Sequence, residues 1–363
     1  MINQVAISNF KILRPAFEME QEASIDFLAK AHAAAAEKQG EVELNEERLR
    51  MLLRRFGVKP NQISKRGLES YEMSSDVKSI LERTIFFGKK ASDMLKLFYT
   101  DSKRAPDHLI HVTCTGYTSP SPAQHLVNFK DWQKSTKVTH AYHMGCYASI
   151  PAIRMAMGFV KSGDSAVDLL HTELCSLHLN PSIHSPEQLV VQTLFADGYI
   201  RYTASPSEVV TEGYKVLGIL EHILPDSEED MTWITADWGM HMTLSREVPK
   251  KIGLALTEFV QSLALTVNTD MSDLIQNAVF AIHPGGPKII DSVQETLKLE
   301  EWQVSESKKI LLQYGNMSSA TLPHVWSEIL KTAKHGQRIV SMAFGPGLTL
   351  FGIVFEVIQE NRK

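Results

Sequence analysis

Two hydrophobic patterns alternate along the chain. Stretches rich in helix-forming residues, with apolar side chains at helical spacing, predict helices, whereas short apolar runs between turn residues predict strands. The predicted helices span residues 23–55, 76–99, 148–160, 250–266, 288–298 and 319–333. The predicted strands lie within residues 108–116, 165–172, 192–204, 277–283, 338–344 and 348–358, the third of them after a turn. Strands that alternate with helices in this way indicate an α/β protein.

The two halves of this pattern resemble each other. In the first half a glycine turn at Gly198 leads into a strand, and in the second half Gly345 and Gly347 lead into the last strand. The repeated succession favours a duplicated unit. The length of 363 residues fits about two domain-sized units.

Composition and charge narrow the class of protein. Apolar residues make up 44% and charged residues 22% of the chain, and the formal net charge of −5 does not indicate nucleic-acid binding. No run of roughly eighteen apolar residues predicts a membrane span, and the first 15 residues lack the pattern of a secretory signal. The three cysteines form no Cys-x-x-Cys motif, which argues against a zinc site or a disulfide framework. We therefore expect a cytoplasmic protein.

Cys146 is the first candidate for chemistry. It lies in the segment 140–149, where an extended run gives way to the helix predicted at residues 148–160. The positive end of a helix dipole favours a thiolate, which is the nucleophilic form of cysteine. A buried, inert cysteine is the alternative, because free cysteines are among the most buried residues.

Two further polar residues fit a reaction at this thiol. His283 ends an apolar strand before the rigid turn Pro-Gly-Gly-Pro, which would fix its ring, although it could also simply cap the strand. Asn316 precedes a predicted helix, where an N-cap is the simpler explanation. As a set, Cys146 can accept an acyl group as a thioester, while His283 and Asn316 can donate to an oxygen that becomes negative.

Five short motifs occur in order along the chain. They are Gly-Cys-Tyr-Ala (145–148), Leu-Phe-Ala-Asp-Gly (194–198), His-Pro-Gly-Gly-Pro (283–287), Tyr-Gly-Asn-Met-Ser-Ser-Ala (314–320) and Phe-Gly-Pro-Gly-Leu-Thr (344–349). In this order they resemble the type III polyketide synthases, the chalcone-synthase-like enzymes of the thiolase superfamily. The resemblance covers residues 100–355, and Asn-Met-Ser-Ser is its most specific part.

The resemblance implies an α/β, thiolase-like fold in which two duplicated βαβαβ-type halves form a five-layered α-β-α-β-α core. The N-terminal half, residues 1–212, would carry the nucleophilic Cys146, and the C-terminal half, residues 213–363, would carry His283 and Asn316. Cys146 would hold the acyl group, and the other two would stabilise the enolate that forms when malonyl-CoA loses carbon dioxide. CoA thioesters would be the substrates of a homodimer that needs no metal or organic cofactor.

The resemblance also assigns residues to the substrate passage. Phe195 matches an aromatic gatekeeper between the CoA tunnel and the cavity, and Met242 falls where plant members often carry a second one. A flexible methionine favours an aliphatic starter, although core filling explains it equally well. Gly345 and Gly347 match the glycine-rich segment that shapes the cavity.

Three more residues are expected to line the cavity, namely Cys114, His178 and Trp233. Trp233 falls at a position that is small in the plant enzymes. A tryptophan there would shorten the polyketide.

A basic cluster lies in the N-terminal third, where members of the family bind the phosphates of CoA. Arg54, Arg55 and Lys59 are candidates for this task because their charges and donors suit phosphate. A solvated helix face is the plain alternative. The whole cluster comprises Arg48, Arg50, Arg54, Arg55, Lys59, Lys65 and Arg66.

These features together predict an acyltransferase similar to type III polyketide synthases. It would condense a fatty acyl-CoA starter with malonyl-CoA on a cysteine thioester and give a pyrone- or resorcinol-type product. The alternative is a ketoacyl-ACP synthase III-like enzyme or a stand-alone ketosynthase, with an acyl carrier protein as partner. A papain-like hydrolase also combines Cys, His and Asn, but its local signature around the cysteine is absent.

Overall fold

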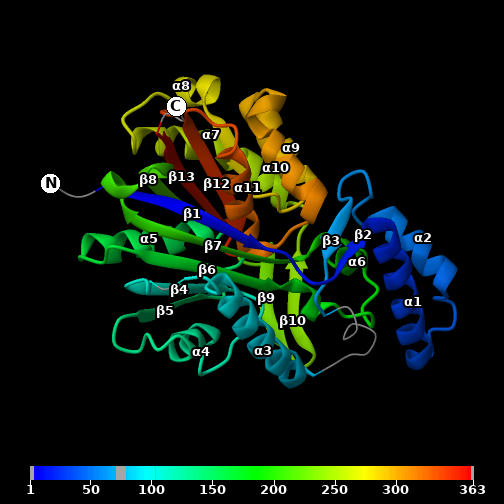
Figure 1. The fold of residues 1–363 in the computed structure, drawn as a ribbon. Coiled ribbons are helices and arrows are strands. Elements are labelled where there is room, and N and C mark those ends of the chain that lie inside the picture. Colours follow the sequence, from blue (N-terminus) through cyan, green and yellow to red (C-terminus); the bar gives the residue numbers. More distant parts are fainter. Residues whose placement is uncertain (1–3, 71–78, 103, 361–363) are drawn as a thin grey trace.

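A mixed β-sheet runs through the molecule (Figure 1). The computed structural model describes residues 4–70, 79–102 and 104–360, and within them this sheet has nine strands in the order β11-β12-β13-β8-β1-β7-β6-β4-β5. The strands are β1 (Val5–Leu13), β4 (His108–Thr113), β5 (Lys137–Tyr142), β6 (Val167–Leu174), β7 (Asp197–Pro206), β8 (Glu212–Ile223), β11 (Val279–Ile282), β12 (Arg338–Gly345) and β13 (Thr349–Gln359).

The order and direction of the strands repeat on the two sides of the central β1–β8 pair. From β1 outward, β7 and β6 are added antiparallel and β4 parallel. From β8 outward, β13 and β12 are added antiparallel and β11 parallel. The duplication expected from the sequence is therefore present in the topology. β8 begins at Glu212, next to the division predicted between residues 212 and 213, which itself stays a prediction.

Apolar side chains on both faces of the strands produce the layers. On β13, Phe351 and Phe355 enter one core, whereas Leu350 and Val354 enter another, as the two-residue period of a strand requires. A strand buried on both faces needs a helix layer on each side.

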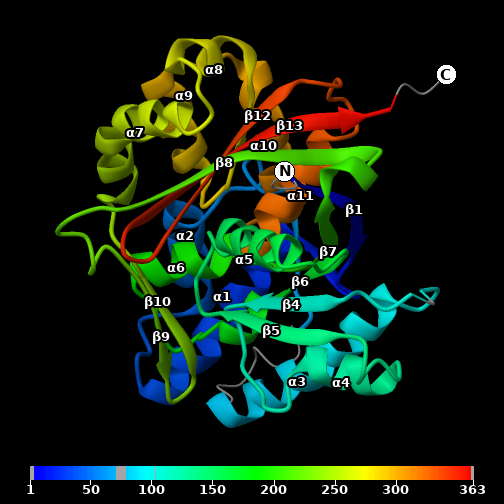
Figure 2. The same ribbon diagram turned by 90° about the vertical axis from the view of Figure 1, so that its left-hand side faces the viewer.

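The helices provide these layers (Figure 2). α5 (Ser149–Lys161) and α11 (Thr321–Ile329) share the central core. α3 (Ile80–Phe98) and α4 (Pro122–Phe129) cover the outer face of the first half, while α7 (Val248–Leu265) and α9 (Pro287–Leu297) cover that of the second. The resulting α-β-α-β-α arrangement confirms the predicted fold class.

The N-terminal region differs from its sequence prediction. Residues 23–55 form two helices, α1 (Gln21–Gln39) and α2 (Glu46–Phe56), so the prediction of one long helix was wrong. Gly40, with φ +79°, closes α1, and the Asn45 side chain accepts from the Arg48 backbone N–H at 3.0 Å to open α2. Both signals are local, and they interrupt a stretch whose composition favours helix throughout.

Other boundaries shift by a few residues. α3 begins after Ser79, and residues 76–78 of the corresponding prediction lie outside the described residues. The turn predicted from residue 192 is the end of an unpredicted helix, α6 (Pro186–Leu194). The remaining elements are α8 (Met271–Asn277), α10 (Glu301–Tyr314), the strand pair β2 (Glu18–Glu20) with β3 (Lys65–Gly67), and the hairpin β9 (Met231–Ala236) with β10 (Gly239–Leu244).

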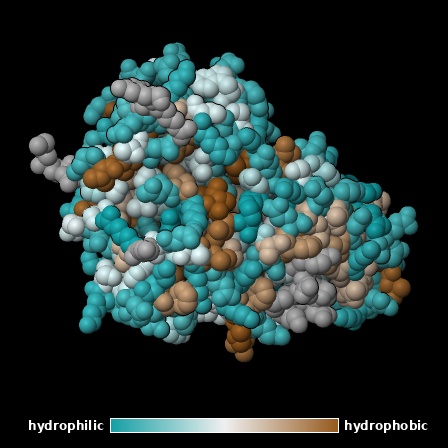
Figure 3. Space-filling view, in the orientation of Figure 1, coloured by the Kyte–Doolittle hydropathy of each residue, from teal (hydrophilic) through white to brown (hydrophobic). Residues whose placement is uncertain are grey.

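The described part of the chain contains no helix that has the length and apolarity to cross a membrane. On the face drawn in Figure 3, hydrophobic residues form small groups between hydrophilic ones.

Substitution of Trp326 in α11 tests how much the packing of the central layer contributes to stability. Its side chain is fully buried, its indole N–H donates to Ser341 Oγ at 2.7 Å, and its ring meets Phe355 edge-on at 5.4 Å. Trp326→Ala should lower the free energy of unfolding by about 3–5 kcal/mol, because it leaves a large cavity. Denaturant titration measures this. Trp302→Ala, on the exposed side of α10, is the control and should change stability by less than about 1 kcal/mol.

Candidate active site

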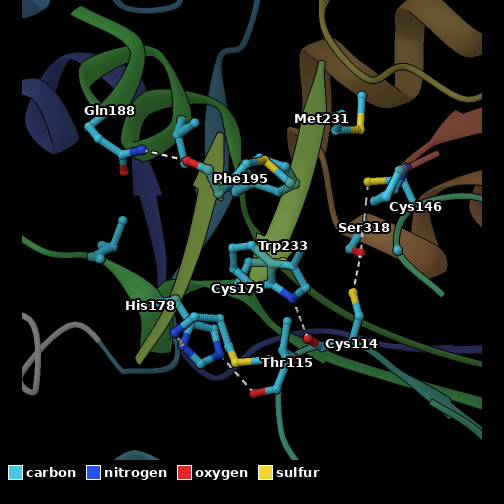
Figure 4. A pocket seen from close by; sticks show the side chains of 16 residues that line it. Cys114, Thr115, Cys146, Cys175, His178, Gln188, Phe195, Met231, Trp233 and Ser318 are labelled. Atoms are coloured by element: carbon cyan, nitrogen blue, oxygen red, sulfur yellow. Dashed lines mark hydrogen bonds between the residues drawn. The ribbon is translucent and has the colours of Figure 1, made fainter. Parts of the chain in front are cut away.

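A largely apolar cavity lies where the ends of several strands, α6 and the β9–β10 hairpin meet (Figure 4). It brings together residues from both halves of the chain. The lining residues are Cys114, Thr115, Gly145, Cys146, Cys175, His178, Leu179, Gln188, Val191, Phe195, Met231, Trp233, Met240, Met242, Ser318 and Pro346.

Cys146 lies on the turn that leads into α5, as the sequence predicted. Gly145 precedes it with φ +79°, and a Cβ there would come within 2.8 Å of Pro346 Cδ. The thiol is buried, 3.9 Å from Ser318 Oγ, and it hydrogen bonds to the Asn316 side chain. Burial raises the pKa of Cys146 to about 12, and the bonds from Ser318 and Asn316 oppose this shift. The helix dipole, which favours the thiolate, is therefore opposed by desolvation of the buried thiol.

Asn316 both caps a helical turn and reaches the thiol. Its Oδ1 accepts from the Ser318 backbone N–H at 2.9 Å, which leaves the amide NH₂ as the donor. Its backbone is tied to the other half of the chain, with Asn316 N donating to Leu194 O at 3.0 Å and Ala196 N donating to Asn316 O at 2.8 Å. The capping explanation and the donor explanation are thus compatible.

His283 directly follows β11 and continues its pairing. Its backbone N–H donates to Met342 O at 2.7 Å, and the Gly285 N–H donates back to His283 O at 2.8 Å. The ring is buried, and neither ring nitrogen has a hydrogen-bond partner among the described residues. Burial lowers the pKa of His283 to about 3, so the imidazole is neutral near pH 7. It therefore offers one N–H donor and one free acceptor.

A buried carboxylate supports the floor of the cavity. Glu173, at the end of β6, accepts from Thr115 Oγ1 at 2.9 Å, from Cys114 N at 3.1 Å and from Ser319 Oγ. Burial raises the pKa of Glu173, whereas these donors stabilise its charged form. Cys114 Sγ in turn lies 2.9 Å from Ser318 Oγ, so the network ends beside Cys146.

The residues expected to form the substrate passage are distributed as follows. Phe195 and Met242 both line the cavity, and the Gln188 amide fixes Met242 by donating to its carbonyl at 2.6 Å. Gly345 and Gly347 do not line it, but Pro346 between them does. A Cβ at Gly345 would approach Tyr147 Cδ1 to 2.4 Å, which explains the glycine.

Cys114, His178 and Trp233 line the cavity as expected. The sequence did not single out several other lining residues. Cys175 follows β6, and Met231 and Met240 alternate with polar residues on a hairpin that was not predicted. Ser318 lies within one of the five motifs, but the sequence did not predict that its hydroxyl contacts the thiols of Cys114 and Cys146. A signal for Ser318 is its place two residues after Asn316, inside the most specific motif.

The basic cluster separates into ion pairs and exposed side chains. Arg54 of α2 pairs with Glu22 of α1, while Arg55 and Lys59 are exposed. Other members are also paired, Arg48 with Glu43 at 3.9 Å, Arg50 with Asp26 at 2.6 Å and Lys65 with Glu18 at 2.8 Å. The assignment of Arg54, Arg55 and Lys59 to CoA phosphates stays a prediction.

Arg66 does not belong to an exposed basic cluster, and its inclusion there was wrong. Its guanidinium is buried and donates to Gln21 Oε1 at 2.9 Å and to Phe195 O at 2.6 Å. Burial lowers the pKa of Arg66 to about 10, which still leaves it charged near pH 7. Arg66 therefore anchors the segment that carries Phe195 rather than a phosphate.

The chain is similar to enzymes of one class. A family model described as the C-terminal domain of chalcone and stilbene synthases matches residues 217–359. Type III polyketide synthase A of Arabidopsis thaliana is 26% identical over 263 residues, 70% of this chain and 66% of that protein. Probable polyketide synthase 1 of Dictyostelium discoideum is 28% identical over 250 residues, 68% of this chain but only 8% of that much longer protein.

Solved structures share the fold over nearly the whole chain. PKS-I from the brown alga Ectocarpus siliculosus superposes with a TM-score of 0.86, at 20% identity and over 99% of both chains. The C-terminal type III polyketide synthase domain of Steely1 from Dictyostelium gives a TM-score of 0.84, at 22% identity, over 98% of this chain and 100% of that one. The likeness shows a thiolase-like fold.

The buried role of Arg66 leads to a testable difference. Arg66→Ala should lower the free energy of unfolding by about 3–5 kcal/mol, because it leaves several buried acceptors without a donor. Arg48→Ala, which removes an exposed pair at 3.9 Å, should cost less than about 1 kcal/mol. Thermal and denaturant unfolding would measure the loss of stability in each variant. Equal effects of both substitutions would contradict the assignment.

Proposed function

We propose that this chain, a member of the type III polyketide synthase family, is an acyltransferase that condenses an acyl-CoA starter with malonyl-CoA. One observation carries the proposal. Cys146 lines a cavity whose lining is mostly apolar, and the Asn316 side chain interacts with its thiol, although Asn316 and His283 themselves do not belong to the lining. The buried imidazole of His283 has no hydrogen-bond partner on either ring nitrogen among the described residues. A buried polar group without an internal partner needs an explanation, and a catalytic role is one such explanation.

Loading would begin with attack of Cys146 on the starter thioester. The Sγ–C bond forms and the C–S bond to CoA breaks. The neutral His283 can take the thiol proton and return it to the departing CoA thiolate. This route removes the need for a thiolate in the resting enzyme, which suits the raised pKa of Cys146.

Extension would follow on the same cysteine. Malonyl-CoA loses carbon dioxide, and the electrons of the broken C–C bond form an enolate. N–H donors of His283 and Asn316 would stabilise its oxygen. The enolate carbon then attacks the acyl carbonyl on Cys146 and expels the thiolate, which gives a β-ketoacyl-CoA longer by two carbons. The chemistry requires no metal or organic cofactor.

The starter we propose is a fatty acyl group, with a pyrone- or resorcinol-type product. Met231, Met240 and Met242 contribute flexible apolar side chains to the cavity, which supports an aliphatic chain over a charged one. Exposed Arg55 and Lys59 would bind the CoA phosphates together with Arg54, and the active form would be a homodimer.

Product mass spectrometry tests the reaction class. Purified protein would be incubated with malonyl-CoA and acyl-CoA starters of increasing length, with Cys146→Ala as the control. We expect products spaced by two-carbon ketide units, absent from the control. Activity that appears only when the acyl groups are supplied on a carrier protein would instead favour the ketosynthase alternative.

Decarboxylation tests the roles of the two donors separately. His283→Ala and Asn316→Ala should each slow the release of carbon dioxide from malonyl-CoA by about 100-fold, equivalent to about 3 kcal/mol per lost oxyanion donor. Cys146→Ala should retain decarboxylation, since the thiol only carries the acyl group. Carbon dioxide release from radiolabelled malonyl-CoA measures all three variants. Wild-type rates in either donor variant would remove that residue from the mechanism.

A further inference from the structure

Trp233 is held in the cavity wall by a hydrogen bond to a backbone carbonyl, which a second side chain also approaches. Its indole N–H donates to the Cys114 carbonyl at 2.7 Å (Figure 4). The Tyr117 hydroxyl lies 3.4 Å from the same carbonyl and within hydrogen-bond distance of His143 Nδ1. Burial lowers the pKa of His143, and the nearby Trp233 backbone acts in the opposite direction, so the His143 ring lies beside Trp233 as well. We call Cys114, Tyr117, His143 and Trp233 the Trp233 clamp.

The backbone conformation at His143 orients its ring towards Tyr117. His143 adopts φ +61°, in the left-handed region that non-glycine residues rarely enter and that costs about 1 kcal/mol or more. Its N–H donates to Thr113 O at 3.0 Å, so the strained conformation lies directly beside the strand end that leads to Cys114. The ring is thereby turned towards Tyr117, which it meets edge-on at 5.4 Å. Strain of this kind persists only where surrounding contacts maintain it.

The hairpin that carries Trp233 depends on such side-chain contacts. β9 and β10 form a sheet of their own that is separate from the nine-stranded one. An isolated two-stranded hairpin is marginally stable by itself. Towards the cavity, β10 is tied down by Gln188 at the Met242 carbonyl and by His178 at the Met240 N–H, at 2.6 and 3.0 Å. On β9 the clamp provides the corresponding attachment.

We propose that Tyr117 and His143 are positioning residues that hold Trp233 as a wall of the cavity and so limit the number of two-carbon extensions. The inference rests on the proposed condensing function. The position of the indole decides how much of the cavity a growing chain can fill, and the clamp decides the position of the indole. Tyr117 and His143 themselves are absent from the cavity lining among the described residues, so they act through Trp233.

The product pattern of point variants tests the proposal. Tyr117→Phe removes the hydroxyl and keeps the ring, and His143→Leu removes both nitrogens. Each should raise the ratio of longer to shorter ketides by about fivefold, the factor that corresponds to one lost hydrogen bond of about 1 kcal/mol. Malonyl-CoA decarboxylation should be unchanged, because Cys146, His283 and Asn316 are untouched. An unchanged ketide ratio in both variants would overturn the proposal.

His140→Leu is the matched control for His143→Leu. His140 is an exposed histidine on β5, three residues earlier, and its Nε2 contacts Ser121 Oγ at 2.8 Å, outside the clamp. It should give the wild-type ratio of products. A shift as large as that of His143→Leu would show that any loss of a histidine near this strand end alters the products, and would overturn the specific role of the clamp.

Amide hydrogen exchange provides a readout that does not depend on turnover. Peptides that cover residues 231–236 should exchange about fivefold faster in Tyr117→Phe and His143→Leu than in the wild type or His140→Leu. Unchanged exchange would overturn the clamp even if the products differed. If the wild type made no ketide from CoA esters, the proposed function would fail. Faster exchange confined to the hairpin in the two variants would even then show that the clamp holds Trp233 in place.

Discussion

The apolar core to which α5 and α11 both contribute, in the middle layer, is the constraint on which the site depends. Both helices are covered by strands of the repeated halves and share one apolar core. Cys146 precedes α5, and Asn316 precedes the turn that leads into α11. Because this shared core holds both helices in place, the residues at their N-terminal sides are fixed as well, and the thiol lies 3.9 Å from Ser318 Oγ. A duplicated fold thus assembles one site from both halves.

Burial sets the chemistry of the polar groups in this interior. It raises the pKa of the Cys146 thiol and of the Glu173 carboxyl, and it lowers that of the His283 imidazole, because low dielectric surroundings disfavour each charged form. The carboxylate of Glu173 is stabilised by several neighbouring donors, whereas the ring of His283 is not bonded to any described residue. The Glu173 network is therefore internally satisfied, whereas the ring nitrogens of His283 have no partner among the described residues.

The fold by itself does not decide the product. Proteins with the same fold can catalyse many different reactions, and the reaction depends on the side chains placed around the shared framework. In this chain the β9–β10 hairpin stands apart from the main sheet and contributes Met231, Trp233, Met240 and Met242 to the cavity. Such a hairpin can change its side chains, or the contacts that hold it, without disturbing the core that carries Cys146.

The sequence by itself determined the α/β class, the repeated halves, and the places of Cys146, His283 and Asn316 at element ends, since period and turn residues act over neighbouring positions. The sequence did not reveal features that depend on contacts between segments far apart in the chain. Arg66 was grouped with the basic cluster, although Gln21 and Phe195 enclose it. The division of residues 23–55 into two helices is different, because the local signals at Gly40 and Asn45 predict it. The sequence also did not predict the raised pKa of Cys146 or the contact between Tyr117 and His143. Desolvation and side-chain partners arise only when segments far apart in the chain pack together.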